Sequence, residues 1–258
     1  MCLILFAYDK HPNYRLIMAA NRDEYHHRST APALFWEDET DVLAGRDLEE
    51  LGTWMGVSKK GRFAVLTNYR ETTFIKNARS RGELVREYLT TKNRPYEFLL
   101  GVQNKQHLYN GFNLLAGDLT DLYYLSNRHH EIIKLKPGIY GLSNHLLDTE
   151  WPKVKRGKSL LKECMNQDRI DPDCFFHFLR DDWQPEDYEL PDTGVGLEKE
   201  RFLAPLFIKG KIYGTKTSTL LMINRENQVY YAERTFNPEK TENPFERAYH
   251  FSLEEDKE

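Results

Sequence analysis

A cysteine stands at position 2, directly after the initiator methionine. Methionine aminopeptidases generally remove Met1 before a small second residue, and the new N-terminus then carries both a thiol and an α-amine. The α-amine has an unperturbed pKa of about 7.7 to 8.0, low enough for it to accept the proton of its own thiol. Cys2 is therefore a candidate nucleophile that needs no histidine.

Such a nucleophile needs a carboxylate to orient it and donors for the oxyanion that forms during acyl transfer. Asp23 can supply the carboxylate, and Asn68 and Asn144 end the strand-like stretches FAVLTN and YGLSN. Their side-chain amides can donate to a developing oxyanion. An asparagine at the end of a strand can equally cap a turn, so both roles stay open for each residue.

The remaining cysteines and the histidines give no metal-binding pattern. Cys164 and Cys174 lack CxxC spacing and read as free thiols that pack as small apolar side chains. No HExxH or comparable spacing joins the histidines, so we predict no metal site; they include His11, His26, His27, His129, His130 and His145. Trp36 and Trp54 can line a pocket for a flat ligand or fill the core.

Charge and length exclude several classes of protein. The chain has 258 residues, with 36 Lys and Arg against 40 Asp and Glu, and no basic run of the kind that follows a phosphate backbone, which argues against nucleic acid. Its apolar runs are far shorter than the roughly 18 residues that span a bilayer, and its start lacks a signal peptide. We predict a cytoplasmic protein with no integral membrane segment, folded as one domain over residues 1–258 with a polar tail from about residue 240.

The order of strand and helix patterns predicts an α+β fold. Strand patterns form hairpins at 2–21 and 53–69, with a polar, ordered loop over 21–39 between them. Helical patterns follow at 79–90 and 95–101, a strand meander at 111–147, helices at 149–166 and 172–182, and strands at 210–224 and 228–236. Such runs of strands and helices suit a layered domain.

Five short motifs carry a resemblance to a known family. They are NRDE (21–24), PALFW (32–36), AGRD (44–47), GTWMGV (52–57) and TNYR (67–70), and the later segments GLSNH (141–145) and YGTKTSTLL (213–221) agree with them. Together they resemble the NRDE family, also called the transport and Golgi organisation protein 2 family. The likeness runs from Cys2 to about Phe236.

That family is in turn similar to cysteine N-terminal nucleophile hydrolases such as bile salt hydrolase and penicillin V acylase. This second resemblance implies a four-layer αββα sandwich of two antiparallel sheets. It also implies the catalytic set Cys2, Asp23, Asn68 and Asn144. The hydrolases carry an arginine where this chain has Ala20, so Arg22 is the candidate to replace it. The substrate-side residues that we derive from the likeness are Asn21, Arg22, Trp54 and Arg201.

Two functions remain open on these grounds. The first is an amide hydrolase that cleaves a non-peptide C–N bond of a small acyl amide through Cys2, with no cofactor required. The second is a carrier that keeps the hydrolase architecture and binds haem or another hydrophobic ligand, with Cys2 or His26 as an axial ligand. A role as an interaction protein in membrane traffic rests on the family name alone.

Overall fold

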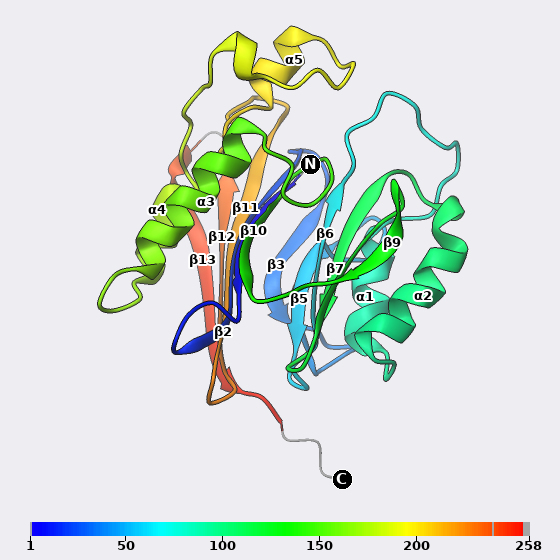
Figure 1. The fold of residues 1–258 in the computed structure, drawn as a ribbon, viewed down its shortest axis with the longest axis vertical. Coiled ribbons are helices and arrows are strands. Elements are labelled where there is room, and N and C mark those ends of the chain that lie inside the picture. Colours follow the sequence, from blue (N-terminus) through cyan, green and yellow to red (C-terminus); the bar gives the residue numbers. More distant parts are fainter. Residues whose placement is uncertain (1, 239, 255–258) are drawn as a thin grey trace.

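Two antiparallel sheets pack face to face in the computed structural model, which describes residues 2–238 and 240–254. Within that part of the chain one sheet has six strands in the order β10-β1-β2-β11-β12-β13, and the other has seven in the order β3-β4-β5-β6-β7-β8-β9. Figure 1 shows the two sheets side by side. The first comprises β1 (Cys2–Tyr8), β2 (Tyr14–Tyr25), β10 (Gly138–Leu142), β11 (Tyr213–Asn224), β12 (Gln228–Asn237) and β13 (Lys240–Ser252). The second comprises β3 (Thr30–Phe35), β4 (Val42–Asp47), β5 (Met55–Ser58), β6 (Phe63–Asn68), β7 (Phe112–Gly117), β8 (Leu122–Ser126) and β9 (His129–Lys134).

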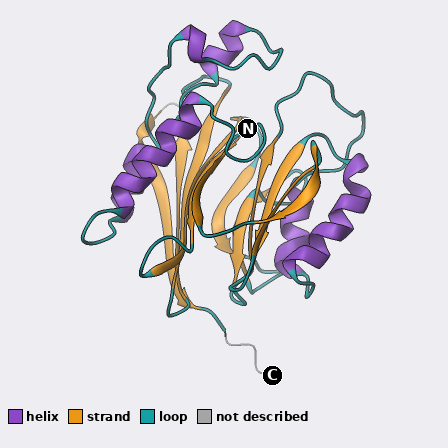
Figure 2. Ribbon diagram, viewed as in Figure 1, coloured by secondary structure: helices purple, strands orange, loops and turns teal. Residues whose placement is uncertain are grey.

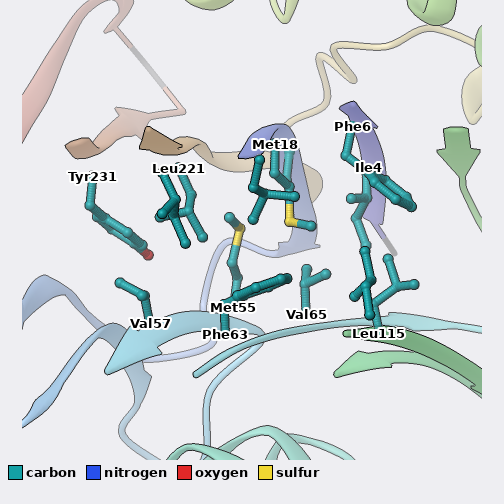
Figure 3. Packing of buried hydrophobic residues seen from close by; sticks show 14 of the residues in the cluster. Ile4, Phe6, Met18, Met55, Val57, Phe63, Val65, Leu115, Leu221 and Tyr231 are labelled. Carbon is teal, nitrogen blue, oxygen red and sulfur yellow. The ribbon is translucent and has the colours of Figure 1, made fainter. Parts of the chain in front are cut away.

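Apolar side chains on alternate strand positions fill the space between the sheets. Ile4, Phe6 and Met18 project from the first sheet toward Met55 and Leu115 of the second, and all five are at most 1% exposed (Figure 3). Because side chains alternate between the two faces of a strand, even-numbered residues of β1 face this core. Each large apolar side chain buried in this way stabilises the fold by roughly 1.5 to 3 kcal/mol.

Helices cover the outer face of each sheet (Figure 2). α3 (Pro152–Met165) and α4 (Pro172–Phe178) pack on the first sheet, and α1 (Gly82–Thr90) and α2 (Pro95–Lys105) pack on the second. α1 buries Leu84, Val85, Tyr88 and Leu89, the same residues whose helical spacing predicted it. The expected four-layer αββα sandwich is confirmed.

The remaining helix, α5 (Leu197–Phe202), and the 3-10 turns Gln106–Leu108 and Asp187–Glu189 lie in connections. α5 stands at the end of the sandwich where β1 begins, and the connection from β6 to α1 rises at the same end (Figure 1). None of the described helices is long and apolar enough to cross a membrane.

Two segments expected to be irregular are strands. The predicted polar loop over 21–39 contains the end of β2, which pairs with β11 as far as Tyr25, and all of β3. The polar tail predicted from about residue 240 is instead β13, which pairs with β12 along its length. The end of the tail, residues 255–258, lies outside the described residues. β13 looks polar because it is an edge strand, whose outer face is solvated. Its Tyr249 and Phe251 nevertheless pack against Phe35.

The prediction of three free thiols was wrong for two of them. Cys164, in the last turn of α3, and Cys174, in the first turn of α4, form a disulfide. The pairing depends on the short loop that turns α4 back beside α3. A separation of ten residues does not reveal that arrangement, because nothing in the spacing fixes how the two helices meet. Cys2 is free.

A candidate active-site cleft at the N-terminal end of the sandwich

An open cleft of about 1000 Å³ lies where β1 begins. Its lining comes from both sheets, from the connection between β6 and α1, and from α5. Of the residues predicted from the sequence, the cleft brings together Cys2, Arg22, Asp23, Trp54 and Asn68. The remaining wall combines charged residues with five aromatic ones, Tyr25, Tyr69, Phe74, Phe202 and Tyr213.

The backbone of Cys2 is held at the start of a central strand. Cys2 pairs with Arg22 on β2, and its carbonyl oxygen accepts a hydrogen bond from Ser143 Oγ at 3.4 Å. Its side chain shares the face of β1 that carries Ile4 and Phe6, so the thiol lies at the open end of the space between the sheets. Burial raises the pKa of the thiol above its ordinary value, so formation of the thiolate requires a base close to the sulfur.

Asp23 is 1% exposed and is held by β11. Its Oδ1 accepts a hydrogen bond of 2.7 Å from Thr215 Oγ1, and its backbone oxygen accepts one of 3.0 Å from Tyr213. The β2–β11 register shifts between Thr215 and Thr217, opposite Asp23 and Arg22, and irregular pairing of this kind can re-aim side chains at a site. Burial raises the pKa of the Asp23 carboxyl, although the hydrogen bond from Thr215 acts in the opposite direction.

Arg22 is buried against the ring of Trp54, with its guanidinium carbon 4.2 Å from the ring centroid. Its Nη2 lies 3.6 Å from Glu24 Oε2 and 3.8 Å from Asp47 Oδ2. Its Nη1 is buried and has no hydrogen-bond partner among the described residues. A cation over an aromatic face is held in place by electrostatic attraction, so Arg22 presents a fixed donor at the cleft.

The two candidate oxyanion asparagines differ in their access to the cleft. Asn68, at the end of β6, lines it. Asn144 is fully buried and lies next to Asn68, to whose carbonyl oxygen its Nδ2 donates at 3.0 Å. The carbonyl oxygen of Asn144 in turn accepts from the backbone N–H of Arg70 at 2.7 Å. In this arrangement Asn144 fixes the strand end that carries Asn68.

Two predicted substrate-side residues lie away from the cleft. Asn21 is 1% exposed, and its amide donates to the carbonyls of Leu179 and Leu206 while its oxygen accepts from Ser218. Through these hydrogen bonds Asn21 connects β2 to the segments that contain Leu179 and Leu206. Arg201 forms an exposed ion pair with Asp187 on the outer side of α5. The expectation that either residue contacts substrate does not agree with this geometry.

Arg70 of the cleft and two buried charged residues behind it, Glu200 and Lys153, were not predicted from the sequence. Arg70 lines the cleft, stacks 4.7 Å from the ring centroid of Trp151 and forms a buried ion pair with Glu200 of α5. Lys153, 3% exposed in the first turn of α3, donates to the carbonyl of Leu203 at 2.8 Å, and burial lowers its pKa to about 8. Arg70 follows directly after TNY in a quoted motif and could have been found there. No pattern around Lys153 indicates a buried amine.

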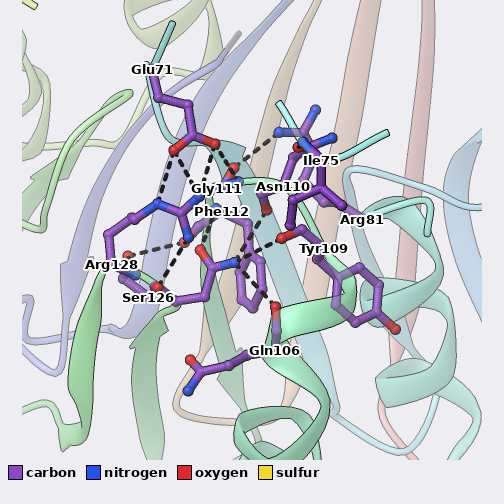
Figure 4. A network of polar contacts seen from close by, with 11 residues as sticks. Glu71, Ile75, Arg81, Gln106, Tyr109, Asn110, Gly111, Phe112, Ser126 and Arg128 are labelled. Carbon is purple, nitrogen blue, oxygen red and sulfur yellow. Dashed lines mark hydrogen bonds and ion pairs between the residues drawn. The ribbon is translucent and has the colours of Figure 1, made fainter. Parts of the chain in front are cut away.

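A polar network holds the base of the connection between β6 and α1 (Figure 4). Glu71 accepts from Arg128 and from the backbone N–H of Gly111, and Arg81 donates to the carbonyl of Gly111. Asn110 Oδ1 accepts from the backbone N–H of Ile75. The wall of the cleft on this side is therefore an ordered segment.

The predicted histidines do not gather at the cleft. His11 lies by the β1–β2 turn, where it contacts Tyr14, and His145 bonds to Thr149. His26 bonds through Nε2 to the carbonyl of Gly210. The side chain of His130 lies outside the described residues. Within the described chain, no group of three or more His, Cys, Asp and Glu side chains could hold a metal ion.

A family model described as Transport and Golgi organisation 2 matches residues 1–238. The chain belongs to this family. The bovine family member, Transport and Golgi organization protein 2 homolog, is 39% identical to it over 91% of this chain and 93% of its own length. The human homolog is 37% identical over 98% of this chain and its entire length. The fruit-fly protein is 26% identical over 91% of this chain and 92% of its own length.

Two hydrolases are among the solved structures similar to this family member. One is the Caenorhabditis elegans N-acylethanolamine-hydrolyzing acid amidase ortholog, with a TM-score of 0.48 and 10% identity over 86% of this chain and 92% of that chain. Another is the conjugated bile acid hydrolase of Clostridium perfringens in its C2A form, with a TM-score of 0.43 and 11% identity over 98% of both chains.

Proposed function

We propose that this protein is an N-terminal nucleophile hydrolase that cleaves the non-peptide C–N bond of a small acyl amide through Cys2. The observation that carries the proposal is the convergence of Cys2, Asp23 and Asn68 on one cleft. They come from β1, β2 and β6, and thus from both sheets. A thiol, a buried carboxylate and a side-chain amide are the groups that acyl transfer requires.

The chemistry begins with removal of Met1, which lies outside the described residues. The freed α-amine takes the proton of the Cys2 thiol, and the thiolate attacks the amide carbonyl carbon. The C–N bond then breaks, and the departing amine takes the proton back from the α-ammonium group. Water hydrolyses the resulting thioester and releases the carboxylic acid together with the regenerated thiol.

The other groups have separate tasks in this scheme. Asp23 accepts a hydrogen bond from the α-amine, and Thr215 keeps the carboxylate oriented. The amide of Asn68 and the unpartnered Nη1 of Arg22 donate to the oxyanion or to the substrate carbonyl. Asn144 positions Asn68 through its hydrogen bond to the Asn68 carbonyl.

Release of fluorescent amine from a series of acyl aminomethylcoumarin amides tests the proposal. Cys2→Ala abolishes turnover, and Asn68→Ala lowers kcat roughly 100-fold, the usual cost of losing one oxyanion donor. Arg22→Ala and Arg201→Ala form a matched pair. Arg22→Ala removes a hydrogen-bond donor from the cleft, so turnover should fall. Arg201→Ala removes only an exposed partner of Asp187, so turnover should stay unchanged. Turnover that survives Cys2→Ala would reject the mechanism.

The aromatic residues that line the cleft beside Cys2 favour a second function, a carrier that binds an apolar ligand without cleaving it. For haem, Cys2 lines the cleft and His26 does not; Cys2 would have to lose its proton to act as the axial ligand. A Soret shift on haem titration that Cys2→Ala removes and His26→Ala retains would support this function. Absence of any shift at micromolar haem would oppose it.

A further inference from the structure

The two segments that border the cleft expose large apolar side chains. Phe74 is 69% and Ile75 46% exposed in the connection between β6 and α1, and Ile212, just before β11, is 70% exposed. Leu197 and Phe202 of α5 are 48% and 39% exposed. Phe74 and Phe202 also line the cleft. The cyan connection and yellow α5 stand at the same end of the molecule, on either side of the N-terminus (Figure 1).

These segments are also basic, although the chain as a whole is acidic. Residues 72–81 contain three Lys or Arg and no Asp or Glu, and residues 194–213 contain four Lys or Arg and two Asp or Glu. The entire chain has a net charge of −4. One of the two acids, Glu200, is buried in its ion pair with Arg70. Lys76, Lys199 and Lys211 form no ion pair within the described residues. All three lysines are exposed.

Hydrogen bonds and a buried ion pair hold the two segments that carry these exposed side chains. On one side Glu71, Asn110 and Arg81 hold the connection to the second sheet (Figure 4). On the other side α5 is fixed by the Arg70–Glu200 pair and by the bond from Lys153 to Leu203. Their exposure is thus a property of the folded protein. Exposed large apolar side chains that lie together on a folded surface mark an interaction site, and Phe74 and Phe202, one from each segment, line the same cleft.

We call the following residues the mouth surface: Phe74, Ile75, Leu197, Phe202 and Ile212, together with Lys76, Lys199 and Lys211. We propose that the mouth surface docks on an anionic lipid bilayer. Apolar side chains enter the boundary between headgroups and acyl chains, while lysines are attracted to anionic headgroups. The basic charge of these segments favours a membrane over an uncharged protein partner. Docking in this way turns the cleft toward the bilayer, and it does not depend on turnover at Cys2.

Sedimentation with vesicles tests the inference. We expect the protein to bind mixed phosphatidylcholine and phosphatidylserine vesicles, to bind pure phosphatidylcholine weakly, and to lose affinity as salt is raised. Phe74→Ser with Ile212→Ser should lower the affinity at least tenfold, since two large apolar side chains no longer enter the bilayer boundary. Lys76→Glu should lower it roughly tenfold, because a charge attracted to the anionic headgroups is replaced by one that they repel.

Matched controls lie elsewhere on the molecule. Phe245→Ser changes a phenylalanine that is 55% exposed on β13, and Lys10→Glu reverses an exposed lysine in the β1–β2 turn. Both should bind as the unchanged protein does, and circular dichroism confirms that each variant is folded. The inference is overturned if the unchanged protein fails to sediment with either vesicle. It is equally overturned if the control variants lose as much binding as the mouth-surface variants.

Discussion

Glu200→Gln removes one partner of a buried ion pair that holds α5 beside the cleft. Glu200 is 2% and Arg70 8% exposed, and Glu200 also accepts hydrogen bonds from the backbone and hydroxyl of Thr193. Removing one charge of a buried pair leaves the other unpaired, at a cost of about 3 to 5 kcal/mol. At roughly 2 °C per kcal/mol for a chain of this size, we expect Tm to fall by about 6 to 10 °C.

The matched control is a second ion pair of α5, between Arg201 and Asp187 of the preceding 3-10 turn. Asp187→Asn breaks this pair, in which the Asp187 side chain is 54% and the Arg201 side chain 49% exposed. An exposed pair is worth at most about 1 kcal/mol, so Tm should change by no more than about 2 °C. Thermal unfolding followed by circular dichroism compares the two variants directly. Equal shifts would refute the argument that burial makes the Arg70–Glu200 pair the anchor of α5.

Three further predictions concern the thiol, the disulfide and the aromatic wall. Because burial raises the pKa of Cys2, its iodoacetamide labelling should reach half-maximal rate at a higher pH than in the urea-unfolded chain; a midpoint at or below that of the unfolded chain contradicts this. Replacing Cys164 and Cys174 by Ser should cost about 3 kcal/mol in a urea titration, from the loop entropy that the disulfide removes; an unchanged midpoint would count against a stable disulfide. Gly45→Ala places a Cβ 2.5 Å from the Trp54 ring, so it should weaken binding of the acyl amide at the cleft, measured by Trp fluorescence. Gly101→Ala, with nothing within 4 Å of its Cβ, should leave that binding unchanged.

The residues of the cleft that lie within local motifs could be predicted from the sequence. Cys2 and Asp23 belong to the first two strands, whose hairpin pairing places residue 2 beside residue 22. Asn68 ends a strand with a clear apolar pattern. Cys2 was predicted from its place after Met1 and Asn68 from the end of a strand pattern, whereas Asp23 lies in a segment predicted as a loop and was predicted from the NRDE motif.

The rest depends on contacts between distant parts of the chain. Glu200 reads as one of several charges on a short polar helix, and its burial follows only from Arg70, which lies 130 positions earlier. Lys153 is buried where the start of α3 meets the end of α5, with its Nζ bonded to the carbonyl of Leu203, and helical periodicity alone does not fix that contact. β13 was missed because one face of an edge strand is polar, so its composition resembles that of a solvated tail.

The intact mass of untagged protein, measured before and after incubation with an acyl aminomethylcoumarin amide, tests the central claim most directly. The hydrolase account predicts a mass without Met1 before incubation. It predicts a transient increase equal to the acyl group afterwards, on Cys2 and absent from Cys2→Ala. Protein that retains Met1, or that has lost Met1 and shows neither an acyl adduct nor released amine, would contradict the account.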